Sequence, residues 1–325
     1  MIFFFSLLCL ITSFSAEASH TWIVGEKSVT FFSEGTQPQT LPMNSIQQTV
    51  LDPSDCSLWV QSSSSLSKIK SDLTKDFEIG TALNLLGDTV SRNSFLTSEG
   101  TNWQIRNEKG IAFSTFPAPA VFPKSLQGDP ESGFWVLDLK EKEKLLELVH
   151  FDKKGTVHWK QVVSEKSEIW GSPVLRFDST SQILWIAFTV TSADHIYSPR
   201  VELWSTSGIR LNHFQATHRG VLFDACLQSP GHLVSASDLP SSPYTAPLFS
   251  FLDLFDSSFS PKRIHTTNEN WLIPSIQCSS SQVWMLKTSL FGVTDHQLVE
   301  WSSAQGEKIH FIFKEPAWKI HHCSL

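Results

Sequence analysis

The sequence predicts an all-β protein, a seven-bladed β-propeller, from three observations. A short tryptophan-centred strand recurs along the chain, a glycine turn recurs downstream of it, and an alternating stretch ends the chain. Four short strands repeated at a regular interval are the pattern of a propeller. The 325 residues are 41% hydrophobic and 18% charged, which suits a folded chain with a sizeable core. Only the stretch Lys140–Val149 has the composition of a helix, and its place in the repeat predicts a charged loop running into a strand.

The first observation is a strand in which Trp stands between apolar neighbours, as in SLWV at Ser57–Val60 and ILWI at Ile183–Ile186. Weaker copies at Ser94–Thr97 and His232–Ser235 complete the series. Recurrence at a strand position favours packing between blades over a stacking platform for sugars or bases. The equivalent positions, spaced by 37 to 50 residues, are Trp22, Trp59, Leu96, Trp135, Trp185, Val234 and Trp284.

The second observation is a glycine turn between two strands, as in Leu148–Trp159 (LVHFDKKGTVHW) and Val201–Phe214 (VELWSTSGIRLNHF). Glycine supplies the positive φ that a tight hairpin requires. The unit of Trp59 lacks this glycine and has Lys70–Leu73 in its place. Asp52 and Asp178 stand seven residues before a repeated Trp, where they are expected to open a turn.

The third observation concerns the end of the chain, where Ala317–Cys323 alternates like a strand but has nothing after it to pair with. The stretch around Trp22 begins at the second strand of a unit, so its first strand is missing. We therefore expect the C-terminal stretch to supply the innermost strand of the first blade. That pairing closes the ring and removes its open edge.

The N-terminus is apolar and uncharged from Ile2 to Ser15, and Ala16-Glu17-Ala18 offers the small residues at which signal peptidase cleaves. We predict a signal peptide at residues 1–18, cleaved before Ser19, and a single propeller domain at residues 19–325. The predicted location is secreted or periplasmic. The remaining cysteines admit three disulfide pairings, or none if they are buried apolar residues; they are Cys56, Cys226, Cys278 and Cys323.

With its LWV-type strands and its glycine turns, the chain resembles propellers of the quinoprotein-like, YVTN-like and NHL-like kind. The stretch VHFDKKGTVHW comes closest to the quinoprotein repeat. The resemblance covers residues 19–325 and implies the fold and a WD40/YVTN-like repeat. It carries over no cofactor and no catalytic residue.

Catalytic and metal motifs give little support for chemistry. His321 and Cys323 share a strand face, but two ligands do not make a metal site. His213 and His218 offer a general base to a lyase, without a carboxylate placed beside them. The sequence predicts no cofactor, no metal site and no catalytic residue. A formal net charge of −7 argues against nucleic-acid binding.

The loops between second and third strands lengthen in the last three units, at Thr191–Pro199, Leu239–Thr245 and Leu290–Asp295. Insertions on one face of a repeat protein often mark the binding face. Both tyrosines of the chain lie there, and tyrosine suits half-wet contacts. The alternative is a set of solvated loops without a partner. The predicted binding surface comprises Asp194, His195, Tyr197, Arg200, Asp238, Tyr244, Asp295 and His296.

The leading functional interpretation is therefore an exported, non-enzymatic module that binds a protein or a cell-envelope component. We expect a monomer without a transmembrane segment. The alternatives are a lyase- or hydrolase-type enzyme at the mouth of the propeller channel and, ranked last, a quinone-dependent dehydrogenase.

Overall fold

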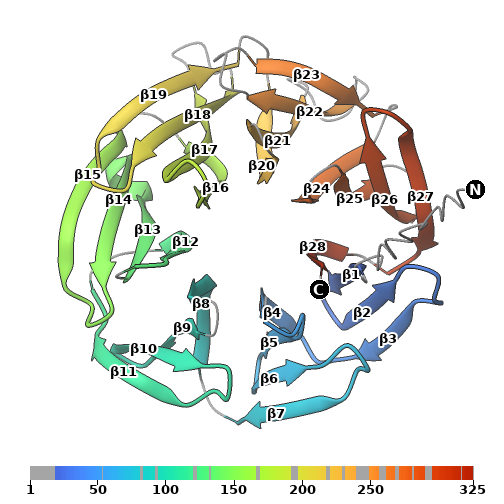
Figure 1. The fold of residues 1–325 in the computed structure, drawn as a ribbon, viewed down its shortest axis with the longest axis horizontal. Helices are drawn as coiled ribbons and strands as arrows, with labels where there is room; N and C mark the ends of the chain where they lie inside the picture. The colour runs from blue at the N-terminus through green and yellow to red at the C-terminus, as the bar shows by residue number, and fades with distance from the viewer. Residues whose placement is uncertain are drawn as a thin grey trace, which may run out of the picture.

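The protein folds into a ring of antiparallel β-sheets (Figure 1). The structure, a computed structural model, describes residues 19–52, 54–80, 83–91, 94–119, 123–131, 133–165, 169–191, 197–216, 220–228, 231–238, 249–255, 261–267, 271–279, 282–289, 295–315 and 317–324. These residues form seven four-stranded sheets, which we number as blades 1 to 7 in chain order. The predicted all-β propeller is confirmed.

Each blade runs from an innermost to an outermost strand. Blade 1 contains β28 (Ala317–Ser324), β1 (Ser19–Gly25), β2 (Ser28–Ser33) and β3 (Gln39–Pro42); blade 2 contains β4 (Ile46–Leu51), β5 (Leu58–Ser62), β6 (Leu66–Ile69) and β7 (Lys75–Ile79). Blade 3 contains β8 (Leu83–Ser91), β9 (Ser94–Glu99), β10 (Asn102–Asn107) and β11 (Ala112–Pro117); blade 4 contains β12 (Pro123–Asp129), β13 (Gly133–Lys140), β14 (Leu145–Asp152) and β15 (Val157–Glu165). Blade 5 contains β16 (Ile169–Asp178), β17 (Ile183–Thr191), β18 (Tyr197–Ser205) and β19 (Arg210–Gln215). Blade 6 contains β20 (Val221–Gln228), β21 (Gly231–Asp238), β22 (Phe249–Phe255) and β23 (Pro261–Thr266); blade 7 contains β24 (Trp271–Cys278), β25 (Val283–Ser289), β26 (His296–Ser302) and β27 (Gly306–Phe313).

The strand order gives the ring two distinct faces. Because each sheet is antiparallel, the start of its innermost strand lies at the same end as the turn between its second and third strands. We call this the entry face. It carries the turns 26–27, 63–65 and 100–101, and also the connections that lead into the innermost strands, such as the one at residues 314–315. The opposite face carries the glycine turns.

The repeated tryptophan positions all lie in second strands, as predicted, and pack between blades. Trp59 is 1% exposed and contacts Phe95 of blade 3, with ring centroids 4.4 Å apart. Trp284 is 2% exposed and belongs to a cluster with Ile23 and Ile320 of blade 1. The interpretation as packing between blades is therefore confirmed.

The glycine turns are in the predicted hairpins and have a second role in packing. Gly155 has φ +79° and lies against the ring of Phe116 in the preceding blade, where a β-carbon would overlap the ring. Gly208 lies in the same way against Trp159, where a β-carbon would come within 2.9 Å of Cε3. Gly35 has the same φ of +79° but nothing within 4 Å. In the unit of Trp59, Leu73 takes the positive φ, 63°, that glycine takes elsewhere.

Replacing Gly155 by Ala is expected to destabilise the protein more than replacing Gly35 by Ala. Both changes strain a backbone at φ +79°, but only the first also inserts a methyl group into a packed junction between blades. The difference between their unfolding free energies, measured by denaturant titration, isolates the steric contribution, which we expect to be about 1–3 kcal/mol. Equal losses would contradict packing of the glycine turn on Phe116.

The C-terminal strand β28 pairs with β1 as the innermost strand of blade 1 (Figure 1). Seven residue pairs join them, from Ser19↔Ser324 to Gly25↔Ala317. A disulfide joins Cys323 in β28 to Cys56 in blade 2, with 5.8 Å between the Cα atoms. A second disulfide joins Cys226 and Cys278, which lie in the innermost strands of blades 6 and 7. The sequence alone does not distinguish these two disulfides from the other possible pairings.

Around β28, hydrogen bonds also link the innermost strand of one blade to that of the next. Ser275 Oγ donates to Asp224 Oδ2 of blade 6 at 2.9 Å and accepts from the Ile320 amide of blade 1 at 3.3 Å. On the other side of β28, His321 Nε2 bonds Thr49 Oγ1 of blade 2 at 2.8 Å. The innermost strand of blade 1 is therefore bonded to both neighbouring blades.

The stretch Lys140–Val149 behaves as its place in the repeat predicted. Residues Glu141–Glu143 form one turn of 3-10 helix, η1, and β14 begins at Leu145. Asp52 and Asp178 also open turns as expected, since their Oδ1 atoms accept the amides of Ser54 and Thr180.

Candidate binding site on the entry face

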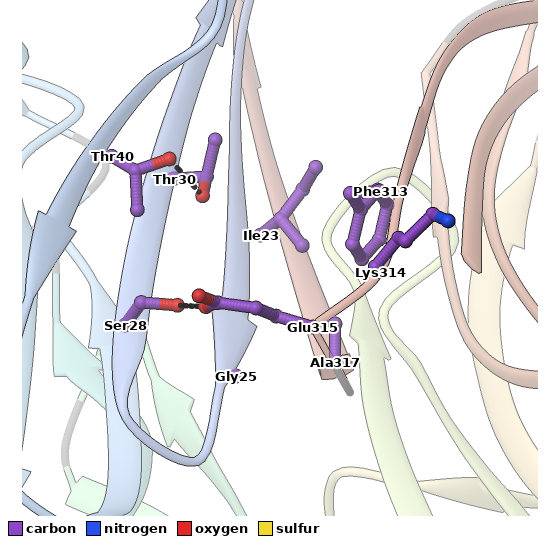
Figure 2. Close-up of a pocket in the computed structure, with 9 residues that line it drawn as sticks. All are labelled: Ile23, Gly25, Ser28, Thr30, Thr40, Phe313, Lys314, Glu315 and Ala317. Carbon is purple, nitrogen blue, oxygen red and sulfur yellow. Dashed lines mark hydrogen bonds between the residues drawn. The ribbon is translucent and has the colours of Figure 1, made fainter. Parts of the chain in front are cut away.

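A pocket of about 280 Å³ opens on the entry face at the junction of blades 7 and 1 (Figure 2). The connection from β27 to β28 forms one side of it, and the strands β1, β2 and β3 form the other. We call it the seam pocket; its lining residues are Ile23, Gly25, Ser28, Thr30, Thr40, Phe313, Lys314, Glu315 and Ala317.

The seam pocket combines apolar walls with a fixed carboxylate. Ile23 and Phe313 face each other across it, while Glu315 reaches over to blade 1 (Figure 2). Ser28 Oγ donates to Glu315 Oε2 at 2.7 Å, which holds the carboxylate in place. The Lys314 side chain extends in a different direction from that of Glu315 (Figure 2).

A second pocket, of about 220 Å³, lies at the junction of blades 1 and 2 and is built in a similar way. The connection from β3 to β4 forms one side, and the turn between β5 and β6 with strand β7 forms the other. Its hydroxyl groups come from the run of serines in that turn. We call it the serine pocket; its lining residues are Pro42, Met43, Asn44, Ser62, Ser64, Ser65, Lys75 and Glu78.

The serine pocket also contains a carboxylate, Glu78, beside serine hydroxyls. The hydrogen bond from the Ser65 hydroxyl lowers the pKa of Glu78, and the charge of Lys75 lowers it further. Lys75 Nζ lies 3.4 Å from Glu78 Oε1, and both side chains are nearly half exposed. Glu78 is therefore ionised at neutral pH.

The turn 26–27 of blade 1 separates the two pockets. Its flanking residues Gly25 and Ser28 line the seam pocket. Its carbonyls hold the connection that borders the serine pocket, because the Met43 amide donates to Lys27 O at 2.8 Å and the Ile46 amide donates to Glu26 O at 2.7 Å. The two pockets thus lie on either side of one ridge, on one face.

The two pockets are lined by similar polar groups. The described linings contain hydroxyls, one amide, two carboxylates and two ammonium groups, but neither histidine nor cysteine. Among the residues that the structure describes, no three His, Cys, Asp or Glu side chains converge as metal ligands would. Neither pocket was predicted from the sequence. The available signals were the serine run at residues 62–65 and the charged connection Lys314–Glu315 before the C-terminal strand.

Three residues of the predicted binding surface, Asp194, His195 and Tyr244, lie outside the described residues. Asp238 ends β21, and the structure describes its backbone only. His218, considered above as a general base, also lies outside, and His213 is exposed on β19. The common face predicted for the three long loops stays a prediction.

Tyr197 and Arg200 are described, and both belong to strand β18. The expected loop Thr191–Pro199 was too long, because Thr191 already pairs with Tyr197 and Thr189 with Pro199 in the β17–β18 ladder. Arg200 Nη2 lies 2.6 Å from Glu202 Oε1, whose side chain is fully buried. An arginine that compensates a buried carboxylate is a structural residue first, which the sequence could not reveal.

Asp295 and His296 lie beside the seam pocket. The Asp295 carbonyl accepts the Ser289 amide at 3.3 Å, and His296 begins β26. The His296 ring stacks on Phe313, which lines the pocket, with centroids 5.5 Å apart. Burial lowers the pKa of His296, while the Asp295 charge acts in the opposite direction. Of the predicted surface, this pair is the part that the structure places next to a pocket.

The ring of four-stranded sheets defines the chain as a β-propeller protein. No protein-family model matches the sequence, and no curated protein matches it either. The chain is similar in structure to the Pan2 WD40 domain of Neurospora crassa, with a TM-score of 0.55 and 9% identity over 84% of this chain and 81% of that one.

Two further solved structures are similar to it. Apo AztD from Citrobacter koseri has a TM-score of 0.53 and 8% identity over 94% of this chain and 98% of that one. BBS1N, solved in complex with ARL6DN, has a TM-score of 0.51 and 10% identity over 86% of each chain. At these identities the likeness shows the fold alone. In the described part of the chain, no helix has the length and apolar character to cross a membrane.

Proposed function

We propose that the protein is an exported β-propeller that binds another protein through its entry face and has no enzymatic activity of its own. The partner is a secreted or cell-envelope protein, and the propeller acts as a monomeric scaffold. Residues 1–18 serve as a signal peptide that is cleaved before Ser19.

The pair of pockets on either side of the turn 26–27 carries this proposal. They lie on one face at successive blade junctions and offer hydrogen-bonding groups beside apolar walls. Such a surface suits the side chains of a polypeptide.

The two disulfides support export. The four cysteines of residues 19–325 pair without remainder, at Cα separations of 5.8 and 5.6 Å that are normal for disulfides. Disulfides persist in oxidising compartments and are rare in the cytosol. We also propose that the β1–β28 pairing, covalently secured by Cys56–Cys323, closes a seven-bladed ring, so that the seam pocket keeps its shape.

Site-specific photo-crosslinking tests the proposed function. A benzophenone amino acid in place of Thr40, on the wall of the seam pocket, is expected to cross-link one discrete partner in the producing cells. The same amino acid in place of Leu211, exposed on the rim of blade 5, is the matched control and should cross-link none. Equal cross-linking at both positions would refute the entry face as binding surface. Full alkylation of the native protein at its four cysteines would refute export.

A further inference from the structure

We propose that the partner is an extended polypeptide segment that places two basic side chains across the turn 26–27, one in the seam pocket and one in the serine pocket. This inference rests on the proposed function and adds the chemistry of the ligand. The observation behind it is that each pocket holds one carboxylate beside serine hydroxyls: Ser28 donates to Glu315, and Glu78 shares the lining of the serine pocket with Ser64 and Ser65.

In the seam pocket, Glu315 is the carboxylate that favours a positively charged side chain of the partner. The hydrogen bond from Ser28 to Oε2 fixes the orientation of the carboxylate. Its other oxygen, Oε1, is therefore already oriented when a ligand binds. Among the residues that the structure describes, no cation forms an ion pair with Glu315. The facing walls of Ile23 and Phe313 suit the aliphatic and planar parts of an arginine side chain, which contacts apolar surface along its stem.

In the serine pocket, the chain itself already places a basic group at the carboxylate. Lys75 Nζ lies 3.4 Å from Glu78 Oε1, but both side chains are nearly half exposed. A surface pair of this kind is weak, so a better-placed cation can replace it. The guanidinium of arginine can bind a carboxylate through two parallel hydrogen bonds, which a lysine ammonium cannot do.

The strength of exposed ion pairs explains why two subsites are required. A single exposed pair changes affinity by only about 1.5- to 5-fold, so one pocket does not hold a partner. When two basic groups belong to one segment, binding of the first raises the local concentration of the second to the millimolar range. Because each exposed pair contributes about 1.5- to 5-fold, two pairs held by one segment raise affinity by about 2- to 25-fold in total. The formal net charge of −7 favours approach of a basic segment.

The experiment uses the intact protein and synthetic peptides in which two arginines are separated by glycine-serine spacers of increasing length. Affinity is measured by fluorescence anisotropy at low ionic strength. The best two-arginine peptide is expected to bind up to about 5-fold more tightly than its one-arginine counterpart. Replacing either arginine by citrulline, which is neutral and nearly the same shape, should remove that gain.

Four protein variants test which residues account for the gain in peptide affinity. Glu315→Gln and Glu78→Gln should each reduce the two-arginine peptide to one-arginine affinity. Lys75→Met should strengthen binding because it frees Glu78. Glu34→Gln, at an exposed carboxylate on the opposite face of blade 1, should change nothing.

Two outcomes would overturn the inference: equal binding of arginine and citrulline peptides, or unchanged binding in both glutamate variants. If Thr40 still cross-links a partner in the Glu315→Gln, Glu78→Gln double variant, the entry face binds a partner of other chemistry. The proposed function then stands and this inference fails.

Discussion

Deleting residues 317–325 is expected to abolish cooperative folding at physiological temperature or to lower the melting temperature by at least 10 °C. The deletion removes β28 and with it the partner of β1 along seven residue pairs. It also removes Ile320, which is fully buried in the cluster between blades 7 and 1, and opens the disulfide to Cys56.

The expected loss of stability is large because β28 pairs with β1 and is linked to blade 2 by a disulfide. The disulfide Cys56–Cys323 spans 267 residues, and a loop of this length constrains the unfolded chain by about 5 kcal/mol in the chain-entropy model. Loss of the strand adds an exposed apolar cluster and an unpaired β1 edge. Small proteins are stable by only about 5–15 kcal/mol, so the combined loss is comparable to the whole.

A matched variant separates the strand from the disulfide. Changing both Cys56 and Cys323 to Ser keeps β28 but removes the covalent link, and should cost about 2–5 kcal/mol. Thermal unfolding followed by circular dichroism compares the two proteins. A deletion variant that melts within two degrees or so of the full chain would show that β28 does not hold the ring together.

Mild acid is expected to destabilise the same junction between pH 6.5 and 4. His321 and His322 lie next to each other on β28 and point to opposite sides of the strand, where His321 is buried and His322 is half-buried. Burial lowers the pKa of His322 to about 4, with the Glu300 charge opposing this and His20 adding to it. Burial also lowers the pKa of His321 well below its usual value, and the charges of Lys319 and Arg176 act in the same direction.

The packing explains why neither imidazole accepts a proton readily. His322 stacks on Trp284 at 4.9 Å, and its Nδ1 bonds Thr21 Oγ1 at 3.0 Å. His321 bonds the hydroxyl of Thr49 rather than a carboxylate. Both residues thus stay neutral in the folded protein under conditions where the unfolded chain is protonated.

The sign of the effect is fixed by linkage. Between pH 6.5 and about 4 the unfolded chain binds more protons than the folded protein, so the free energy of unfolding falls as the pH falls. For His322 alone the loss from pH 6.5 to 5 is about 2 kcal/mol. Glu307, whose pKa is lowered to about 2 mainly by its hydrogen bond with His265, loses its contribution in a different range, below pH 4.5.

Melting curves between pH 7 and 5 test this prediction. His322→Gln cannot titrate, so its melting temperature should change less across this range than that of the natural protein. His213→Gln, at an exposed histidine of blade 5, is the control and should keep the natural pH dependence. An unaltered slope in His322→Gln would place the acid sensitivity elsewhere.

The repeated strands and turns could be predicted from the sequence, because each copy shows the same local pattern of residues. The tryptophan strands around Trp59 and Trp284, the glycine turns at Gly155 and Gly208, and the turn at Asp52 each follow from spacing and local backbone chemistry. The alternation in Ala317–Cys323 predicted a strand, and this strand pairs with β1. Such patterns are readable because each strand or turn obeys the same local rule in every unit.

The contacts between residues far apart in the chain became visible only in the folded molecule. The pairing of Cys56 with Cys323 depends on the approach of blade 2 to the end of the chain, and composition permits other pairings equally well. Arg200 had the sequence features of a surface anchor, yet it lies against the buried Glu202. Ser28 and Glu315, which build the seam pocket, are 287 residues apart. Side-chain pairs across a blade junction follow no local period, so they are fixed by the geometry of the ring and not by any motif in the chain.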